Sequence, residues 1–232
     1  MSAHATTLKP YKGKGMEGLV AKWYAALTKK SLDRYKELAQ RTARELVPRS
    51  NVLEVAPGPG YYAIDLARLG NYKITGLDIS KTFVEIARDN AAKAGVRIDF
   101  ERGNASNMPF PDDAFDFIVC AAAFKNFTEP QRALEEMYRV LKPGGSALIV
   151  DLRKDTPIET INQAVDAMNV GAVNRVITKL TFRFMLLKRA YTRSGFEQLI
   201  ARTPFRDFQI QENLIALEVL LKKAAGPGLI FF

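Results

Sequence analysis

The feature that most constrains the fold is a regular alternation of short β-rich runs with longer segments of helical periodicity. Five runs predict strands, at Asn51–Val55, Lys73–Asp78, Arg97–Glu101, Phe115–Cys120 and Ser146–Leu152. Ser80 can cap the helix after the second run. Lys142-Pro143-Gly144-Gly145 predicts the end of the helix before the fifth. Strands that alternate with helices pair in parallel through right-handed crossovers, so we expect an α/β fold with helices on both faces of a mostly parallel sheet.

The segments that flank this core also have readable patterns. The spacing of apolar residues predicts an amphipathic helix at Ser31–Val47 and a second helix at Met16–Leu27. It also predicts mostly helical structure over residues 156–202 and two strands within Phe208–Leu221. No composition shift marks a second domain. We therefore expect a single domain, residues 1–232, in four parts: an N-terminal helical cap (1–48), a cofactor-binding core (49–152), a helical insertion or lid (153–204), and the last strands and tail (205–232).

Composition sets broad limits on the class of protein. Of 232 residues, 47% are hydrophobic and 25% are charged, which is ordinary for a globular protein with a sizeable core. No stretch approaches the ~20 apolar residues that span a bilayer, and the N-terminus lacks a signal-like apolar region. The single cysteine, Cys120, excludes an internal disulfide, and its apolar run predicts a buried strand residue. We expect a cytoplasmic location.

The positive charge is concentrated in two segments. The net charge is +9, yet residues 1–30 hold six lysines against one glutamate, and residues 170–193 hold six basic residues and no acidic one. Such patches suit an anionic partner, although a solvated basic surface is the alternative. As one helix, Val173–Tyr191 has Phe182 and Leu186 among the cations on one side. The opposite side is an apolar stripe of Val173, Val176, Ile177, Leu180, Phe184 and Leu187.

Apolar side chains interleaved with positive charge predict an interfacial helix or a lid over the substrate. We therefore expect the 170–193 segment to contact an anionic membrane surface peripherally, or to cover the site. A helix that is buried on both sides, or broken near Thr181, is the alternative.

The first strand leads into a loop that predicts a nucleotide-like ligand. Gly58 and Gly60 permit positive φ and close approach of a ligand, and the following helix offers free N–H groups. Asp78 ends the second strand, where a carboxylate lies beside a ribose. Glu54 is a carboxylate inside the first strand, and the positive amino-acid end of S-adenosylmethionine would give it a partner. The glycines also satisfy the dinucleotide pattern, so an NAD-dependent oxidoreductase remains the alternative.

Four blocks follow in order: VLEVAPGPG, TGLDIS, MPFPDDAFDFIV and RVLKPGG. Over roughly residues 50–152 they resemble class I S-adenosylmethionine-dependent methyltransferases of the small-molecule branch. The resemblance implies a Rossmann-like sheet of seven strands, the last one antiparallel near Ile215–Leu221. It implies a cofactor site formed by Glu54, Ala56, Gly58 and Gly60 around the methionine part, Asp78 on the ribose, Ile79, Asn104 and Ala105 around the adenine, and Ala121 with Ala122 on the floor. Asn104 stands where the family often has Asp.

The run Phe124-Lys125-Asn126-Phe127 is similar to the C-methyltransferases of ubiquinone and menaquinone biosynthesis, which carry Arg-Asn where this chain has Lys125-Asn126. The resemblance implies a small, partly apolar acceptor that is quinone-, phenol- or lipid-like. We take Lys125 and Asn126 as the candidate catalytic residues. Lys125 would stabilise an anionic oxygen or act as a base, and Asn126 would position a hydroxyl or carbonyl. A loop lysine facing water and a turn asparagine are the alternatives.

Other acceptors and groups have weaker support. Because of the basic patches, an RNA or protein acceptor remains an alternative. Adenine-methylating enzymes carry Asn/Asp-Pro-Pro-Tyr after the fourth strand, whereas this chain has AAAFKNF there, which argues against a nucleic-acid acceptor. The one histidine, His4, makes a histidine base improbable. Tyr11 and Tyr24 are lesser candidates, and we assign no metal ligands.

Overall fold

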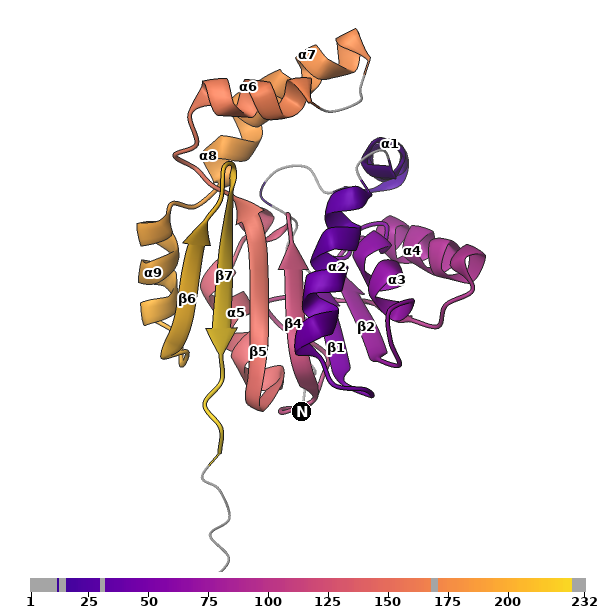
Figure 1. Ribbon diagram of the computed structural model, residues 1–232, viewed down its shortest axis with the longest axis vertical. Coiled ribbons are helices and arrows are strands. Elements are labelled where there is room, and N and C mark those ends of the chain that lie inside the picture. The colour runs from indigo at the N-terminus through magenta and orange to yellow at the C-terminus, as the bar shows by residue number, and fades with distance from the viewer. Residues whose placement is uncertain (1–11, 13–15, 30–31, 168–170, 227–232) are drawn as a thin grey trace, which may run out of the picture.

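The computed structural model describes residues 12, 16–29, 32–167 and 171–226. Its centre is a seven-stranded sheet in the order β3-β2-β1-β4-β5-β7-β6 (Figure 1). β1 to β5 are parallel, and β7 is antiparallel to both β5 and β6. The strands are β1 (Asn51–Val55), β2 (Lys73–Asp78), β3 (Asp99–Arg102), β4 (Phe115–Ala121), β5 (Leu141–Leu152), β6 (Asp207–Glu212) and β7 (Ala216–Lys222). The predicted Rossmann-like fold, including the antiparallel last strand, is confirmed.

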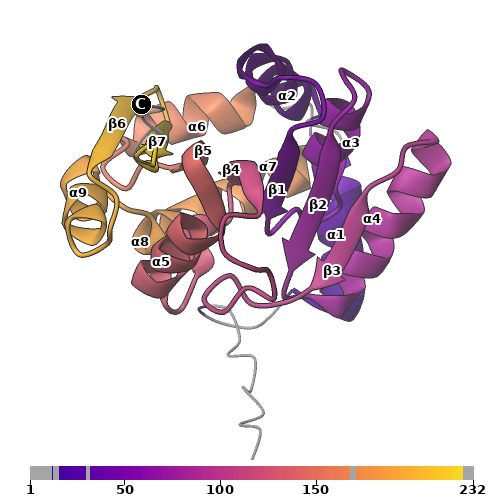
Figure 2. The ribbon, with the colours of Figure 1, turned by 90° about the horizontal axis from the view of Figure 1, so that it is seen from below.

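The central strands bury side chains on both faces, as parallel strands do. Val52 and Val119 pack under α2 (Asp33–Glu45), α3 (Tyr61–Ala67) and α4 (Lys81–Ala94). Leu53 and Ile118, one residue away in each strand, pack on the opposite face under α5 (Pro130–Val140) and α9 (Arg193–Ala201). Figure 2 shows these two helical layers with the sheet between them. Cys120 is fully buried in β4, as predicted.

Local signals placed most helix ends correctly. The Ser80 hydroxyl accepts a hydrogen bond from the Phe83 amide (3.1 Å) and caps α4. The predicted helices near Met16–Leu27 and Ser31–Val47 are α1 (Gly18–Thr28) and α2. The fifth strand, however, begins at Leu141 and not at Ser146, so the expected turn at Lys142–Gly145 lies inside β5. There the pairing with β4 shifts from Phe115↔Leu141 to Phe117↔Ser146, which accommodates the extra residues as a bulge.

The segment after β5 lies beyond the carboxyl ends of the parallel strands, as α1 does (Figure 1). It comprises α6 (Ile158–Asp166), α7 (Ala172–Thr181), a π-helical turn (Phe182–Leu186) and α8 (Leu187–Arg189). α7, the turn and α8 follow one another without interruption, so most of the predicted Val173–Tyr191 helix exists. It ends at Arg189, and Arg193 belongs to α9.

The orientation predicted for this helix was wrong. Most of the expected buried stripe is exposed, with 58% of Val176, 49% of Leu180 and 53% of Phe184 accessible, and only Leu187 of its described side chains packs against the core. Phe182 and Leu186, expected among exposed cations, pack against a small core cluster with Ile161 and Val165 of α6. The side chain of Val173 lies outside the described residues.

Contacts with α6 give the physical reason for the reversal. Asp166 at the end of α6 pairs with Lys179 (2.7 Å) and with Arg175 (3.8 Å), which turns the basic side of α7 inward. The π-helical turn then adds a residue per turn and moves Phe182 and Leu186 onto the α6 side. Tertiary contacts therefore decided which of two apolar faces became buried.

We predict that Phe182→Ser lowers the free energy of unfolding by about 1–3 kcal/mol, because it removes an aromatic ring from a packed cluster. Phe184→Ser, two residues away and exposed, should change it by less than about 0.5 kcal/mol. Urea denaturation of both variants measures the difference. Equal losses would contradict the observed orientation of the helix.

Candidate functional site

The loop between β1 and α3 has the backbone expected of a ligand cradle. Ala56, Gly58 and Gly60 all have positive φ, at 56°, 54° and 77°. A β-carbon on Gly60 would lie 2.9 Å from the ring of Phe100, so this position requires glycine for space as well as for conformation. The loop brings the start of α3 to the carboxyl end of β1.

Asp78 fastens this loop to the end of β2. Its buried carboxylate accepts hydrogen bonds from the Gly58 amide (3.0 Å) and from the Ser80 amide (2.9 Å), one on each oxygen. Burial raises the pKa of Asp78 to about 6, and the two amide donors act against that shift. Each oxygen keeps lone pairs that can accept further hydrogen bonds from a diol.

Glu54 is a buried acid with little compensation. It is 3% exposed and accepts one hydrogen bond, from the Ala63 amide (3.1 Å). Burial raises its pKa to about 8. Since an unfolded glutamate titrates near ~4.3, the ionised group increasingly disfavours the folded state as pH rises from about 4 to about 8. Across the described residues no basic side chain forms an ion pair with Glu54, so a cationic ligand group would find a ready partner there.

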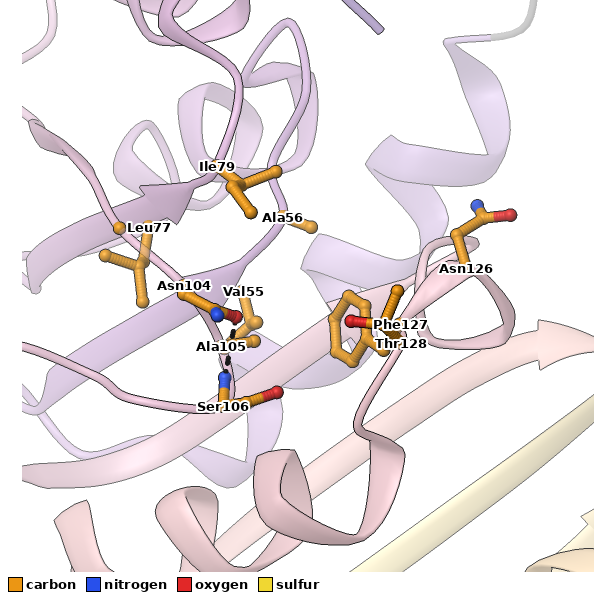
Figure 3. Close-up of a pocket in the computed structure, with 11 residues that line it drawn as sticks. Val55, Ala56, Leu77, Ile79, Asn104, Ala105, Ser106, Asn126, Phe127 and Thr128 are labelled. Carbon is orange, nitrogen blue, oxygen red and sulfur yellow. Dashed lines mark hydrogen bonds between the residues drawn. The ribbon is translucent and has the colours of Figure 1, made fainter. Parts of the chain in front are cut away.

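A pocket opens beside this loop, at the ends of β1, β2 and β3 (Figure 3). Five of the predicted site residues line it: Ala56, Ile79, Asn104, Ala105 and Asn126. The other lining residues are Val55, Leu77, Gly103, Ser106, Phe127 and Thr128. The wall is therefore mostly apolar with a few polar groups, as small-molecule sites are.

The other predicted cofactor residues lie around this pocket and not on its wall. Glu54, Gly58, Gly60 and Asp78 form the loop and its anchor, and Ala121 ends β4. Asn104 uses its amide oxygen to accept a hydrogen bond from the Ser106 amide (3.0 Å), shown dashed in Figure 3. That oxygen still has one lone pair free for an adenine-like amino group.

Lys125 does not face water, contrary to the alternative considered for it. Its ammonium donates to Asp151 Oδ1 (2.8 Å) and to the carbonyl of Ala122, and its side chain is 6% exposed. The other oxygen of Asp151 accepts from the Lys125 amide (2.8 Å). The ammonium is thus engaged inside the protein, so the geometry favours a positioning role over direct contact with an acceptor.

Asn126 lies at the boundary of the pocket. In Figure 3 its carboxamide points away from Asn104 and Ala105. The amide oxygen accepts a hydrogen bond from Arg189 (3.4 Å), and the backbone carbonyl accepts from the Lys12 amide (3.0 Å). Asn126 therefore connects the pocket with two basic residues that are distant in sequence.

The N-terminal cap is fixed to the cofactor side of the site. The Glu17 carboxylate accepts from the Lys81 amide (3.0 Å) and the Thr82 amide (3.1 Å) at the start of α4. Tyr24 in α1 packs edge-on against Phe83, with ring centroids 5.9 Å apart, and burial raises the pKa of its hydroxyl. The hydroxyl therefore stays protonated at neutral pH. Tyr11 and His4 lie outside the described residues.

Sequence reasoning missed the network that holds the loop after β3, whose first residues line the pocket. Arg139 donates to Glu136 (2.7 Å) and Asp112 (2.8 Å) and to the carbonyls of Met108 and Phe110. Glu136 in turn accepts from the Met108 amide (2.7 Å), which ties the loop after β3 to α5. Arg139 and Asp112 both occur in the quoted blocks, but their spacing gave no sign that they interact. Among the described residues no group of three or more His, Cys, Asp or Glu gathers as metal ligands.

Comparison with known proteins shows which families this chain is similar to. Residues 53–149 match the family model described as a methyltransferase domain. Demethylmenaquinone methyltransferase of Deinococcus radiodurans is 40% identical over 101 residues, which is 43% of this chain and 42% of that protein. The ubiquinone/menaquinone biosynthesis C-methyltransferase UbiE of a Marinomonas species is 36% identical over 119 residues, or 50% and 47%. The chain spans about half the length of the curated relatives that it matches.

Residues 53–149, less than half of the chain, are therefore similar to a methyltransferase domain. A solved structure from Methanococcus maripaludis, itself provisionally assigned as an S-adenosyl-L-methionine-dependent methyltransferase, superposes with a TM-score of 0.71. It is 20% identical and covers 94% of this chain and 98% of its own, which supports the fold over nearly the whole length. The methyltransferase family model does not extend to α1 and α2 or to α6 and the helices that follow it.

We predict that Lys125→Met lowers the free energy of unfolding by about 3–5 kcal/mol, because it removes the ion-pair partner of Asp151 in the interior. Lys142→Met is the matched control. Lys142 pairs with Asp116 at the same 2.8 Å, but both side chains are more than a third exposed, so the loss should stay below about 1 kcal/mol. Chemical denaturation of both variants tests this, and similar small losses would argue against a structural ion pair at Lys125.

Proposed function

We propose that this protein transfers a methyl group from S-adenosylmethionine to a small, partly apolar acceptor. The observation that carries the proposal is the buried, uncompensated Glu54 carboxylate beside the glycine loop and Asp78. The cofactor, when bound, supplies a methyl group on a sulfonium and carries a positive ammonium that suits Glu54. A pyrophosphate-bearing cofactor such as NAD would bring negative charge there instead.

Each cofactor residue has a proposed task. Gly58 and Gly60 leave room for the methionine part, and Asp78 accepts hydrogen bonds from the ribose hydroxyls. Ile79 packs on the adenine ring, and Asn104 with Ala105 binds its edge. Ala56 lies beside the methionine part, and Ala121 forms the floor beneath the sulfonium. The positive φ of the glycine loop and the buried carboxylates of Glu54 and Asp78 support this assignment.

The acceptor side is proposed to begin at Asn126 and Phe127, which share the pocket wall with Ile79 and Ala105. Methyl transfer from a sulfonium is an in-line displacement, and holding the two reactants in line supplies much of the rate. We propose that Asn126 positions the acceptor oxygen or ring, while Lys125, through Asp151, fixes the turn Phe124–Asn126. The quinone-related names of the relatives support a quinone-, phenol- or lipid-like acceptor. Within residues 153–204, α9 packs on the sheet, so we propose that α6, α7 and α8 form the lid and that it belongs to the same domain.

We predict that S-adenosylmethionine binding at pH 7 releases up to about one proton, because its ammonium stabilises the ionised form of Glu54, whose pKa is about 8 without ligand. Calorimetry in two buffers of different ionisation enthalpy measures this release. Glu54→Gln should abolish it, and Asp78→Ala should weaken binding roughly 5- to 150-fold, equivalent to about 1–3 kcal/mol.

NAD serves as the comparison ligand in the same assay. Binding of NAD in place of S-adenosylmethionine would support the oxidoreductase alternative. Wild-type affinity in Asp78→Ala would overturn the assignment of the ribose site. RNA or peptide acceptors are tested by adding each one with S-adenosylmethionine that carries a labelled methyl group. Transfer of the label to RNA or to peptide would overturn the proposal of a small acceptor.

We also propose that the protein contacts an anionic membrane surface through the edge that carries the site. Two helices, α1 and α7, lie beyond the carboxyl ends of the strands (Figure 1). Both expose large apolar side chains. They are Leu19, Val20 and Trp23 of α1, and Val176, Ile177 and Leu180 of α7, followed by Phe184 and Met185. The exposed cations Lys22, Lys29, Arg183 and Lys188 accompany them. No helix in the described ranges has the length and hydrophobicity to cross a bilayer, so this contact would be peripheral.

We predict that the protein sediments with phosphatidylglycerol vesicles at low salt and less so at high salt. Replacing Ile177, Leu180 and Phe184 together with serine should reduce the bound fraction severalfold. The control replaces Val47 and Leu69, which are equally apolar and exposed but precede β1 and β2 at the opposite edge of the sheet. The membrane proposal fails if the triple serine variant binds as well as the control variant and wild type, or if wild type does not bind.

A further inference from the structure

A second cavity lies next to the candidate acceptor site and is strongly basic. Its lining residues are Lys12, Lys154, Lys188, Arg189, Ala190, Tyr191, Thr192 and Gly195. The four cations come from three separate parts of the chain: the N-terminal segment, the turn after β5, and the end of α8. No acidic side chain is among the lining residues.

These four cations lack the ion pairs that other basic residues of the molecule form. Within the described ranges, their side chains make only two hydrogen bonds. Lys12 donates to the Tyr191 hydroxyl (3.2 Å), and Arg189 donates to the Asn126 side chain (3.4 Å). By contrast, Arg175 and Lys179 on the same helical segment share Asp166. Like charges that converge without a counterion repel one another, and an anion that enters the cavity relieves this repulsion.

Several contacts hold the cavity in shape. The Lys154 amide donates to the Tyr191 carbonyl (3.0 Å), which joins two walls. The Lys12 ammonium lies 5.3 Å from the centre of the Tyr191 ring, and that ring packs on Phe124 with centroids 5.9 Å apart. Tyr191 therefore links the basic cavity to the turn that presents Asn126. Lys12, Arg189 and Tyr191 are half-buried in this cavity, and Lys154 and Lys188 lie exposed at its rim.

The position of Asn126 connects this cavity to the reaction. Asn126 lies at the boundary of the pocket proposed for the cofactor, and its carboxamide points away from Asn104 and Ala105 (Figure 3). Its amide oxygen accepts a hydrogen bond from Arg189 of the basic cavity. An acceptor bound at Asn126 would have its methyl-accepting end next to the cofactor and an anionic end in the basic cavity. We infer that the basic cavity binds a phosphate-class anionic group of the acceptor. This inference rests on the proposed function and adds a charged group to an otherwise partly apolar substrate.

Phosphate chemistry matches the side chains better than a single carboxylate does. Three ammonium groups and one guanidinium provide more positive charge than one carboxylate neutralises, whereas a phosphate monoester or diphosphate carries about two or more negative charges at neutral pH. Arginine binds phosphate oxygens through two parallel donors, and lysine adds compact point charges. The phosphate can belong to a soluble molecule or to a lipid headgroup.

The experiment uses inorganic pyrophosphate as the probe and the full chain as the protein. We expect calorimetry to show binding that weakens as salt rises, and Lys188→Gln/Arg189→Gln to weaken it at least tenfold. Lys22→Gln/Lys29→Gln removes the same charge from exposed positions of the α1 segment, outside the cavity, and should change affinity less than about twofold. Absent binding, or equal losses in the two double variants, would overturn the inference.

Two further measurements separate the outcomes. S-adenosylmethionine affinity is measured in every variant, so a failure of the proposed cofactor site is distinguished from a failure of the basic cavity. Phosphatidic acid vesicles and glycerol 3-phosphate then distinguish the two sources of phosphate. A headgroup ligand predicts that Lys188→Gln/Arg189→Gln reduces vesicle binding and that pyrophosphate competes with vesicles. A soluble ligand predicts glycerol 3-phosphate binding that the same variant weakens, with vesicle binding unchanged.

Discussion

The reversal of strand order between β1 and β4 is the constraint on which the site depends. From β1 the chain builds outward to β2 and β3, then returns to the other side of β1 as β4 and β5. Connections on either side of that junction leave in opposite directions, and a crevice opens at the carboxyl ends of the strands. The glycine loop, Asp78, Asn104 and Asn126 follow four different strands, and only this topology gathers them around one opening.

At the edge where the parallel strands begin, opposite the candidate site, the sheet is held together by residues from the same sequence blocks. Lys142 pairs with Asp116, and Asp116 also accepts a hydrogen bond from the Asn51 amide (2.8 Å), so β1, β4 and β5 are joined where β1 and β4 begin. Arg139 of α5 secures the loop after β3 through the Met108 carbonyl. Sequence blocks that match the methyltransferase-domain model therefore include residues that stabilise the fold at a distance from the glycine loop. Resemblance at such residues supports the fold more than the chemistry.

The sequence predicted what local patterns determine. β1 and β2 begin and end at the predicted residues, and Ser80 caps α4, because strand burial and capping depend on neighbours in sequence. It did not predict the partner of Lys125, since Asp151 lies 26 residues away and β-sheet pairing alone brings them together. It also assigned the wrong faces to α7, because two apolar stripes compete there and Asp166 of α6 decides between them. The basic cavity escaped notice for the same reason, as its cations come from distant segments.

The position of β7 in the sheet affects how the chain folds during synthesis. β7 lies between β5 and β6, and it pairs with β5 from Ser146↔Lys222 to Leu152↔Ala216. During synthesis, therefore, β5 presents an open, apolar edge until residues 216–222 have emerged, long after the first five strands are complete. An unpaired strand edge is a template for association with other chains. The interval between translation of Leu152 and of Lys222 is thus the period in which this protein most needs protection from aggregation.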